Sequence, residues 1–146
     1  MNILACLDLS QSTEKVVEKA EEIAKAVSAK LWLLHVAEPE PDFVGYEVGP
    51  QSVRDSLSKK FHHEHRQIQE IAERMRKNGI ETTALLVQGS TVGTILMKAT
   101  TVSADMIVVG SHGKGPMSRL LVGSVSEGVL RKAHCTILVV PTHERE

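Results

Sequence analysis

A glycine-rich segment at residues 110–128 contains the residues best suited to chemistry. It reads GSHGKGPMSRLLVGSVSEG and follows an apolar run at 106–109. Glycines let a backbone approach a ligand closely and turn its N–H groups inward. A helix beginning after Gly123 would add unpaired N–H groups and the positive end of a helix dipole. With Lys114 and Arg119 supplying positive charge, the segment suits the phosphates of a nucleotide.

Ser124 adds a hydroxyl that can donate to a phosphate oxygen and cap the same helix. Two standard phosphate-binding motifs are absent. The P-loop pattern GxxxxGK[ST] does not occur, and GxGxxG fails because Ser118 stands where its last glycine would be. The residues alone therefore leave two interpretations open, a phosphate-binding loop and a plain connection.

Alternating apolar segments predict the elements that must position this loop. Short apolar runs at 2–7, 30–36, 80–87, 104–109 and 135–140 are typical of buried strands. Helical spacing and capping residues predict helices after Ser10 and Ser12, over about 52–77, over about 91–102 and near 124–132. Three prolines and two glycines at 37–50 predict a loop.

Strands that alternate with helices in this way predict an α/β fold, with an open parallel sheet covered by helices on both faces. Two strand orders, 3-2-1-4-5 and 2-1-3-4-5, are common for such sheets. In the first order the winding direction reverses between the strands at 2–7 and 104–109, and ligands bind beyond the carboxyl ends of such strands. The glycine segment follows the second of these strands, so it lies where a ligand is expected.

Composition limits the classes of protein and their location. The 146 residues suit one domain spanning 1–146, and the net charge of −1 offers no strong field for nucleic acid. The N-terminal apolar stretch is too short for a signal peptide, and no run approaches the roughly 18 apolar residues of a membrane span. A cytoplasmic location without membrane insertion is expected. Cys6 and Cys135 lie in strand-like runs, where buried thiols are expected rather than a disulfide.

The spacing Gly110-x2-Gly113-x9-Gly123-Ser124 resembles the G-x2-G-x9-G-[S/T] motif of the universal stress protein family, in its ATP-binding branch. The similarity extends along the chain, because NILACLDLS, LWLLHV, ADMIVVGSHG and GSVSEGVLRKAHCTILVVP are similar to other segments of that family. The resemblance implies a Rossmann-like fold of the adenine nucleotide alpha hydrolase-like type with strand order 3-2-1-4-5. It also implies ATP or AMP, with or without Mg²⁺, bound between strands one and four.

The resemblance assigns roles to residues that match the family's motifs. Asp8 would contact the adenine end, beside Leu7 and Cys6, the last of which stands where relatives often have proline. Val36 would pack against the base. The ribose and phosphates would be met by Val109, Gly110, His112, Gly113, Gly123, Ser124 and Val125.

The resemblance further implies a homodimer that pairs the last strand, Thr136 to Val140, with its copy. Such pairing would protect an apolar edge strand. The protein would act as a nucleotide-responsive stress-response regulator of a partner protein that the sequence does not identify. Two alternatives stay open: a slow ATPase assisted by Ser124 and a phosphate-bound Mg²⁺, and a dimeric interaction module that does not use nucleotide.

Other chemistry finds little support in the residues. A phosphoacceptor site would need an acidic pair after the first strand, where Asp8 is the single acid. The histidines at 62, 63 and 65 lack the HExxH zinc pattern because Gln67 replaces its second histidine, so a solvated helix face is expected. His35 lies in a strand and is expected to be structural. No nucleophile, base and orienting group occur together.

Overall fold

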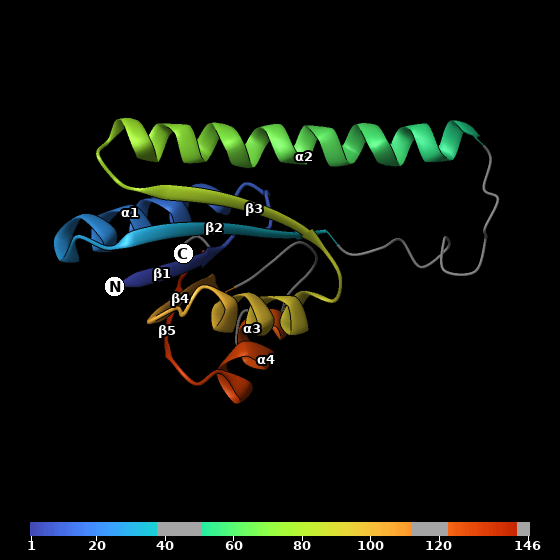
Figure 1. Ribbon diagram of the computed structural model, residues 1–146. Helices are drawn as coiled ribbons and strands as arrows, with labels where there is room; N and C mark the ends of the chain where they lie inside the picture. The colour runs from blue at the N-terminus through green and yellow to red at the C-terminus, as the bar shows by residue number, and fades with distance from the viewer. Residues whose placement is uncertain (38–50, 112–122, 143–146) are drawn as a thin grey trace, which may run out of the picture.

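The computed structural model describes residues 1–37, 51–111 and 123–142, and for residues 51–55 it describes the backbone alone. Helices and strands alternate along these ranges (Figure 1). The elements are β1 (Asn2–Cys6), α1 (Thr13–Val27), β2 (Lys30–Ala37), α2 (Gln51–Lys77), β3 (Thr82–Gln88), α3 (Thr91–Thr101), β4 (Met106–Gly110), α4 (Ser124–Lys132) and β5 (Thr136–Val140).

The strands form one parallel sheet in the order β3-β2-β1-β4-β5. At its centre, Leu4 of β1 is paired with Trp32 of β2 on one side and Ile107 of β4 on the other. The predicted α/β fold is therefore confirmed, and of the two common strand orders the chain adopts 3-2-1-4-5. The winding direction reverses between β1 and β4, which is where open sheets of this kind bind ligands.

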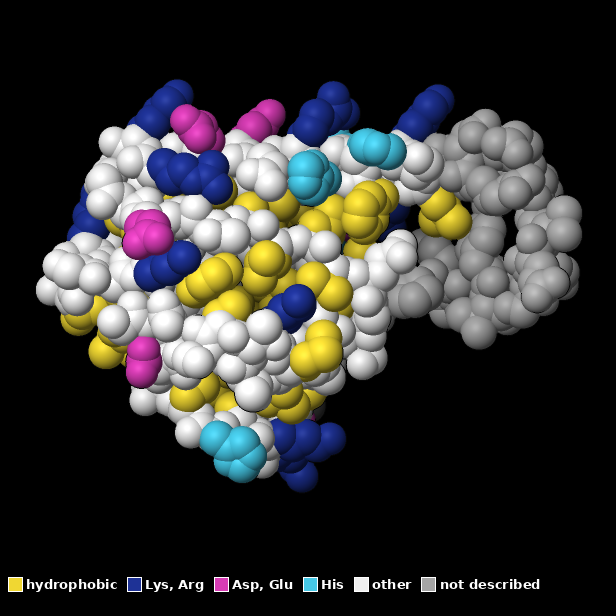
Figure 2. Space-filling view, viewed as in Figure 1, with side chains coloured by type: hydrophobic (Ala, Val, Ile, Leu, Met, Phe, Trp, Pro, Cys, Tyr) yellow, Lys and Arg dark blue, Asp and Glu magenta, His cyan; other side chains and the backbone are white. Residues whose placement is uncertain are grey.

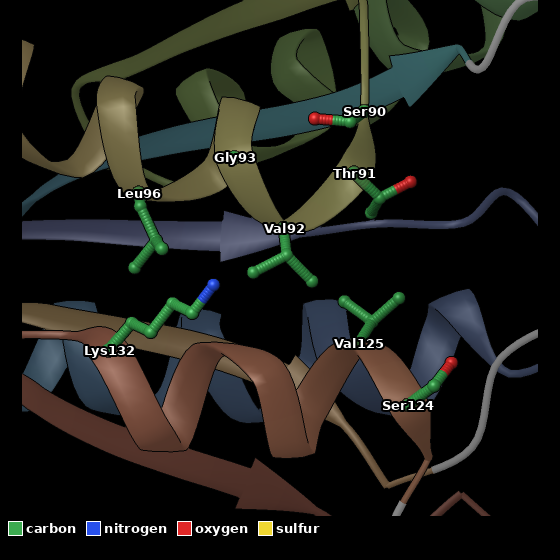
Figure 3. Close-up of a pocket in the computed structure, with 8 residues that line it drawn as sticks. All are labelled: Ser90, Thr91, Val92, Gly93, Leu96, Ser124, Val125 and Lys132. Atoms are coloured by element: carbon green, nitrogen blue, oxygen red, sulfur yellow. The ribbon is translucent and has the colours of Figure 1, made fainter.

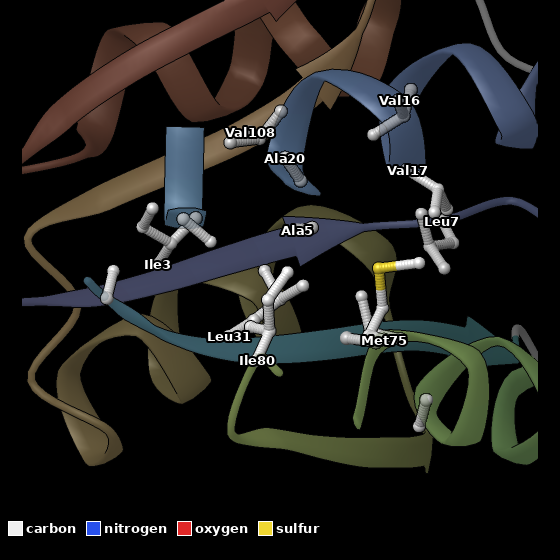
Figure 4. Close-up of a cluster of buried hydrophobic side chains, with 14 of the residues drawn as sticks. Ile3, Ala5, Leu7, Val16, Val17, Ala20, Leu31, Met75, Ile80 and Val108 are labelled. Carbon is white, nitrogen blue, oxygen red and sulfur yellow. The ribbon is translucent and has the colours of Figure 1, made fainter. Parts of the chain in front are cut away.

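Two apolar layers cover the sheet. Because side chains alternate along a strand, Ile3 and Ala5 of β1 face the layer under α1 and α2, whereas Leu4 and Cys6 face the layer under α3 and α4. Figure 1 shows the two helix pairs on opposite sides of the sheet. In the α1/α2 layer, Met75 reaches from α2 toward the residues of β1 and β2 (Figure 4). Each fully buried aliphatic side chain of these layers contributes about 1.5–3 kcal/mol to folding.

Asn78 and Gly79, a pair typical of helix ends, follow the last residue of α2. Gly79 has a φ of +86°, a left-handed conformation that glycine adopts without steric cost. Its N–H donates to the Arg76 carbonyl at 3.0 Å, and the Ile80 N–H donates to the Met75 carbonyl at 3.1 Å. These two bonds form a Schellman motif, which satisfies carbonyls that the helix end leaves unpaired.

Two local predictions for α1 are wrong. Helical spacing predicts Val27 on the apolar face of the helix, but Val27 is 45% exposed because it is the last residue of the helix and lies beyond the buried stripe. Ser12 occupies the N-cap position, but its side chain makes no capping bond, and its dihedral angles are helical. Instead the Ser10 hydroxyl accepts the Ser12 N–H at 3.2 Å. Among the described residues, none of the helices has the length and apolar character that crossing a membrane requires.

Candidate functional site

Asp8 lies in the turn that leaves the carboxyl end of β1. One carboxylate oxygen, Oδ1, accepts hydrogen bonds from the Ser10 N–H at 3.0 Å, the Ser10 hydroxyl at 2.7 Å and the Thr13 hydroxyl at 3.2 Å. The bond to the N–H two residues later is an Asx turn, which aspartate favours because its short side chain reaches its own backbone. Leu9, between these residues, has a left-handed φ of +59°. The turn therefore holds Asp8 in one orientation.

The second carboxylate oxygen of Asp8, Oδ2, is in a different situation. It is buried and has no hydrogen-bond partner in the described part of the chain. An unpaired buried acceptor costs about 1–3 kcal/mol, and more when it is charged. An unsatisfied oxygen at a topological switch point fits a ligand that brings an N–H donor to it, and the exocyclic amino group of adenine is such a donor.

Three predicted pocket residues share one face of the sheet near its carboxyl edge. Cys6 of β1, Val36 of β2 and Val109 of β4 belong to the layer under α3 and α4, and Val125 of α4 packs in the same layer. Burial raises the pKa of the Cys6 thiol to about 12, so the group stays neutral and acts as a small apolar side chain. These residues offer an apolar wall suited to the flat face of a base.

Leu7 lies differently, because its side chain is buried in the opposite layer, under α1 and α2. Its backbone stays close to the sheet, and the Leu7 N–H donates to the Leu34 carbonyl at 2.8 Å. Leu7 therefore borders the candidate site through its peptide group, which joins it to Asp8.

Hydrogen bonds hold the two described ends of the glycine segment side by side. The Gly123 N–H donates to the Ser111 carbonyl at 2.6 Å, and the Ser126 hydroxyl donates to the Gly110 carbonyl. Ser111 is anchored in turn, since its N–H donates to the Val140 carbonyl at 2.8 Å. These contacts place the first turn of α4 directly beside the carboxyl end of β4. His112 and Gly113, also predicted to meet the phosphates, lie outside the described residues.

The N-terminus of α4 has no side-chain cap. Gly123, not Ser124, is the N-cap residue, so the prediction that Ser124 caps the helix is wrong. Ser124 is instead the first helical residue, and it is exposed. The first N–H groups of a helix have no intrahelical partners and attract anions. This end of α4 retains the features of a phosphate site.

A groove of about 470 Å³ runs between α3 and α4, from the first turns of both helices to Lys132 at the end of α4. Val92 and Val125 face each other across it, and Lys132 extends from the last turn of α4 toward α3 (Figure 3). The groove is lined by Ser90, Thr91, Val92, Gly93, Leu96, Ser124, Val125 and Lys132. Sequence reasoning had selected only Ser124 and Val125 of this set. The others were not predicted because no motif marks them and the crossing of the two helices brings them together.

The three histidines of α2 form no metal site in the described residues. His62, His63 and His65 are exposed, and imidazole side chains are visible along α2 on the face shown in Figure 2. The His62 Nδ1 donates to the Ser58 carbonyl at 2.6 Å, a contact within the helix. Among the described residues, no group of at least three His, Cys, Asp or Glu side chains lies close enough together to hold a metal ion.

His35 is buried, as expected, but it has a charged partner that the sequence reasoning missed. Its Nε2 forms a short hydrogen bond with Oε2 of Glu64, and both residues are buried. Glu64 lies three residues after Phe61 and four before Ile68, so helical spacing puts it on the same face of α2 as these two apolar residues. A carboxylate on an apolar stripe was the signal that could have identified it.

The fold and the residues at the carboxyl ends of β1 and β4 define a class of protein. It is the class of open doubly wound α/β proteins with a ligand site at the topological switch point. The profile of the universal stress protein family matches residues 1–141. A universal stress protein of Thermus aquaticus, from the QAH/OAS sulfhydrylase 3′ region, is 32% identical over 144 residues, covering 94% of this chain and 96% of that protein. The chain belongs to the universal stress protein family.

Solved structures share the fold along the whole chain. The hypothetical protein MJ0577 superposes with a TM-score of 0.82 at 26% identity, covering 99% of this chain and 97% of that one. A universal stress protein in complex with cAMP superposes with a TM-score of 0.70 at 24% identity, covering 98% of each chain. The resemblance found in the sequence is thus confirmed at the level of family and fold.

Proposed function

We propose that this universal stress protein binds an adenine nucleotide, ATP or AMP, between the carboxyl ends of β1 and β4. In this proposal the base lies at Asp8 and the phosphates lie at the N-terminus of α4. Bound nucleotide changes the surface presented to a regulated protein, which makes the chain a nucleotide-responsive regulator of the stress response.

The observation that carries the proposal is the unpaired, buried Oδ2 of Asp8. The adenine amino group is a donor that would satisfy this oxygen, whereas guanine and hypoxanthine present a carbonyl acceptor at the same ring position. The apolar side chains of Cys6, Val36 and Val109 supply a surface for the base nearby. A family structure with this fold holds cAMP, whose base is also adenine.

The proposed position of the phosphates is supported by the glycine motif and by the N-terminus of α4. Gly110 and Gly123 are held beside each other through Ser111 and Ser126, so the segment that joins them begins and ends at one place. The uncapped first turn of α4 and the exposed Ser124 hydroxyl then offer donors to phosphate oxygens. Mg²⁺ bound with ATP would neutralise part of the phosphate charge.

We further propose that two copies pair through β5 and that the protein works in the cytoplasm. β5 is an edge strand, and its residues Ile137, Leu138 and Val139 are only partly buried. An apolar edge strand is an open template for pairing, and a second copy of β5 would cover it.

The nucleotide proposal is tested by releasing bound nucleotide from the purified protein and by measuring thermal shifts with ATP, AMP and Mg²⁺. The informative variant is Asp8→Asn, which replaces the carboxylate with an amide that has only one acceptor oxygen. A matched control is Glu14→Gln, the same change of charge at an exposed residue of α1 that pairs with Arg74 at 2.8 Å. We expect retention or a thermal shift in the wild type and in Glu14→Gln, and weaker retention and a smaller thermal shift in Asp8→Asn.

The same measurements can contradict the proposal. A wild-type protein that neither retains adenine nucleotide nor gains thermal stability from ATP or AMP would contradict the proposal. The nucleotide-independent interaction module would then be the better account.

A further inference from the structure

The buried imidazole of His35 joins three parts of the fold. It belongs to β2, its Nδ1 lies 2.8 Å from the carbonyl oxygen of Leu7 at the end of β1, and its Nε2 is bonded to Glu64 of α2. His35 and Glu64 are 6% and 8% exposed, so both groups are removed from water. A charged helix residue and a strand histidine buried together require mutual hydrogen bonding to be tolerated.

The partners of His35 determine where its protons lie. A carbonyl oxygen only accepts, so Nδ1 must carry the hydrogen that it donates to Leu7. The Nε2 of His35 then faces a carboxylate oxygen of Glu64, and a hydrogen bond there requires one more proton between them. Glu64 therefore fixes the orientation of the ring that donates to Leu7.

The Leu7 carbonyl matters because it belongs to the peptide group that connects Leu7 to Asp8. The Leu7 N–H is already bonded to Leu34 at 2.8 Å, and His35 holds the carbonyl. Beyond this peptide, Ser10 and Thr13 hold Oδ1 of Asp8. The chain is thus fixed on both sides of the Asp8 Cα, which sets the direction in which Oδ2 points.

We propose that His35, oriented by Glu64, is a positioning residue for the adenine end of the site. It acts through the Leu7 carbonyl and makes no contact with the base, because its side chain lies on the α1/α2 side while Cys6, Val36 and Val109 line the other. This inference rests on the proposed function, since it needs a base bound at Asp8. It adds that α2 supports the nucleotide site from the opposite face of the sheet.

The test compares paired variants by calorimetric titration with adenosine and with AMP, well below the melting temperature of each protein. His35→Leu removes the N–H that donates to the Leu7 carbonyl. His35→Asn keeps such a donor, because the amide nitrogen of asparagine is bonded to Cγ, as Nδ1 of histidine is. We expect His35→Leu to weaken both ligands by about 3- to 10-fold, the effect of one lost hydrogen bond. His35→Asn should stay within about twofold of the wild type, because its donor is retained.

Glu64 supplies a second, independent pair of variants. Glu64→Gln can donate its amide N–H to a neutral His35 and keep the ring in place, whereas Glu64→Leu leaves Nε2 without a partner. We expect wild-type affinity for adenosine in Glu64→Gln and weaker binding in Glu64→Leu. If His35→Leu does not fold, as judged by circular dichroism, this pair decides the question.

The outcomes separate this inference from the function on which it rests. Wild-type affinity in His35→Leu, equal losses in His35→Leu and His35→Asn, or equal affinities in the two Glu64 variants would overturn the positioning role. If Asp8→Asn alone weakens adenosine, the site stands and the inference fails. If the wild type binds neither adenosine nor AMP, both fail.

Discussion

Gly128 of α4 lies so close to Val92 of α3 that a Cβ on the glycine would be 2.8 Å from the Val92 Cγ2. The helix contact that shapes one wall of the groove therefore depends on the absence of a side chain at position 128. Gly128 therefore serves the packing of α4 against α3.

Replacing Gly128 with alanine should destabilise the protein. Helix propensity alone predicts a gain of about 1 kcal/mol, whereas overpacking in a filled contact costs about 1–3 kcal/mol. We expect overpacking to dominate, giving a lower midpoint in urea denaturation. The single tryptophan, Trp32, provides the fluorescence signal.

A second substitution controls for this effect. Val92→Ala removes the two methyl groups that meet the new Cβ, so the double variant should lose much less than the sum of the two single losses. Additive losses would show that the Gly128–Val92 contact is not the cause.

The Ser111 side chain should stabilise the folded protein by binding the backbone of Thr142, the last residue that the structure describes. Its Oγ accepts the Thr142 N–H at 3.0 Å, and both residues are buried. Ser111→Ala removes the acceptor for this N–H, which should lower the free energy of unfolding by about 1–3 kcal/mol. The measurement is urea denaturation.

Thr101→Ala is the control for the Ser111 substitution. It removes an exposed hydroxyl that donates to the Met97 carbonyl at 2.9 Å, and it should change stability by no more than about 0.5 kcal/mol. Equal effects of the two substitutions would contradict the role given to Ser111.

The thiol of Cys6 should be inert in the folded protein. Burial raises its pKa to about 12, and the thiolate is the reactive form, so raising the pH from 7 to 9 leaves it protonated. Burial and the neighbouring charge of Asp105 also raise the pKa of Cys135. We expect a thiol reagent at pH 8 to label Cys6 only after denaturation, with mass spectrometry identifying the labelled residue. Labelling of native Cys6 at the rate of a free cysteine would contradict this prediction.

The sequence was sufficient to predict the elements, but its residues left two strand orders open, and the resemblance to the universal stress protein family favoured the order that the sheet adopts. Each strand is a short apolar run, buried most fully in β1 and β4 and only partly in the edge strands β3 and β5. The helices between the strands have clear apolar stripes, so the local pattern predicts the elements. The universal stress protein motif then placed Asp8, Gly110 and Gly123 at the same edge of the sheet, where the structure has them.

The features that the sequence did not predict depend on how elements distant in the chain pack together. Glu64 stands on the apolar face of α2, but only the packing of α2 over β2 identifies His35 as its partner. The groove between α3 and α4 is lined by residues of both helices, including Val92 and Val125, and no local pattern encodes how these helices meet. Ser124 was misassigned as a cap because Gly123 can occupy the same N-cap position without a side chain.

The most direct test of the central claim compares AMP with IMP, which differ at the ring position proposed to face the unpaired Oδ2 of Asp8. AMP offers an amino donor there and IMP a carbonyl acceptor. A hydrogen bond to a charged group contributes about 1.5–3 kcal/mol, so calorimetric titration of the wild type should show AMP binding at least about tenfold more tightly. In Asp8→Asn the preference should largely disappear. Equal affinity of the wild type for AMP and IMP, or an unchanged preference in Asp8→Asn, would contradict the account.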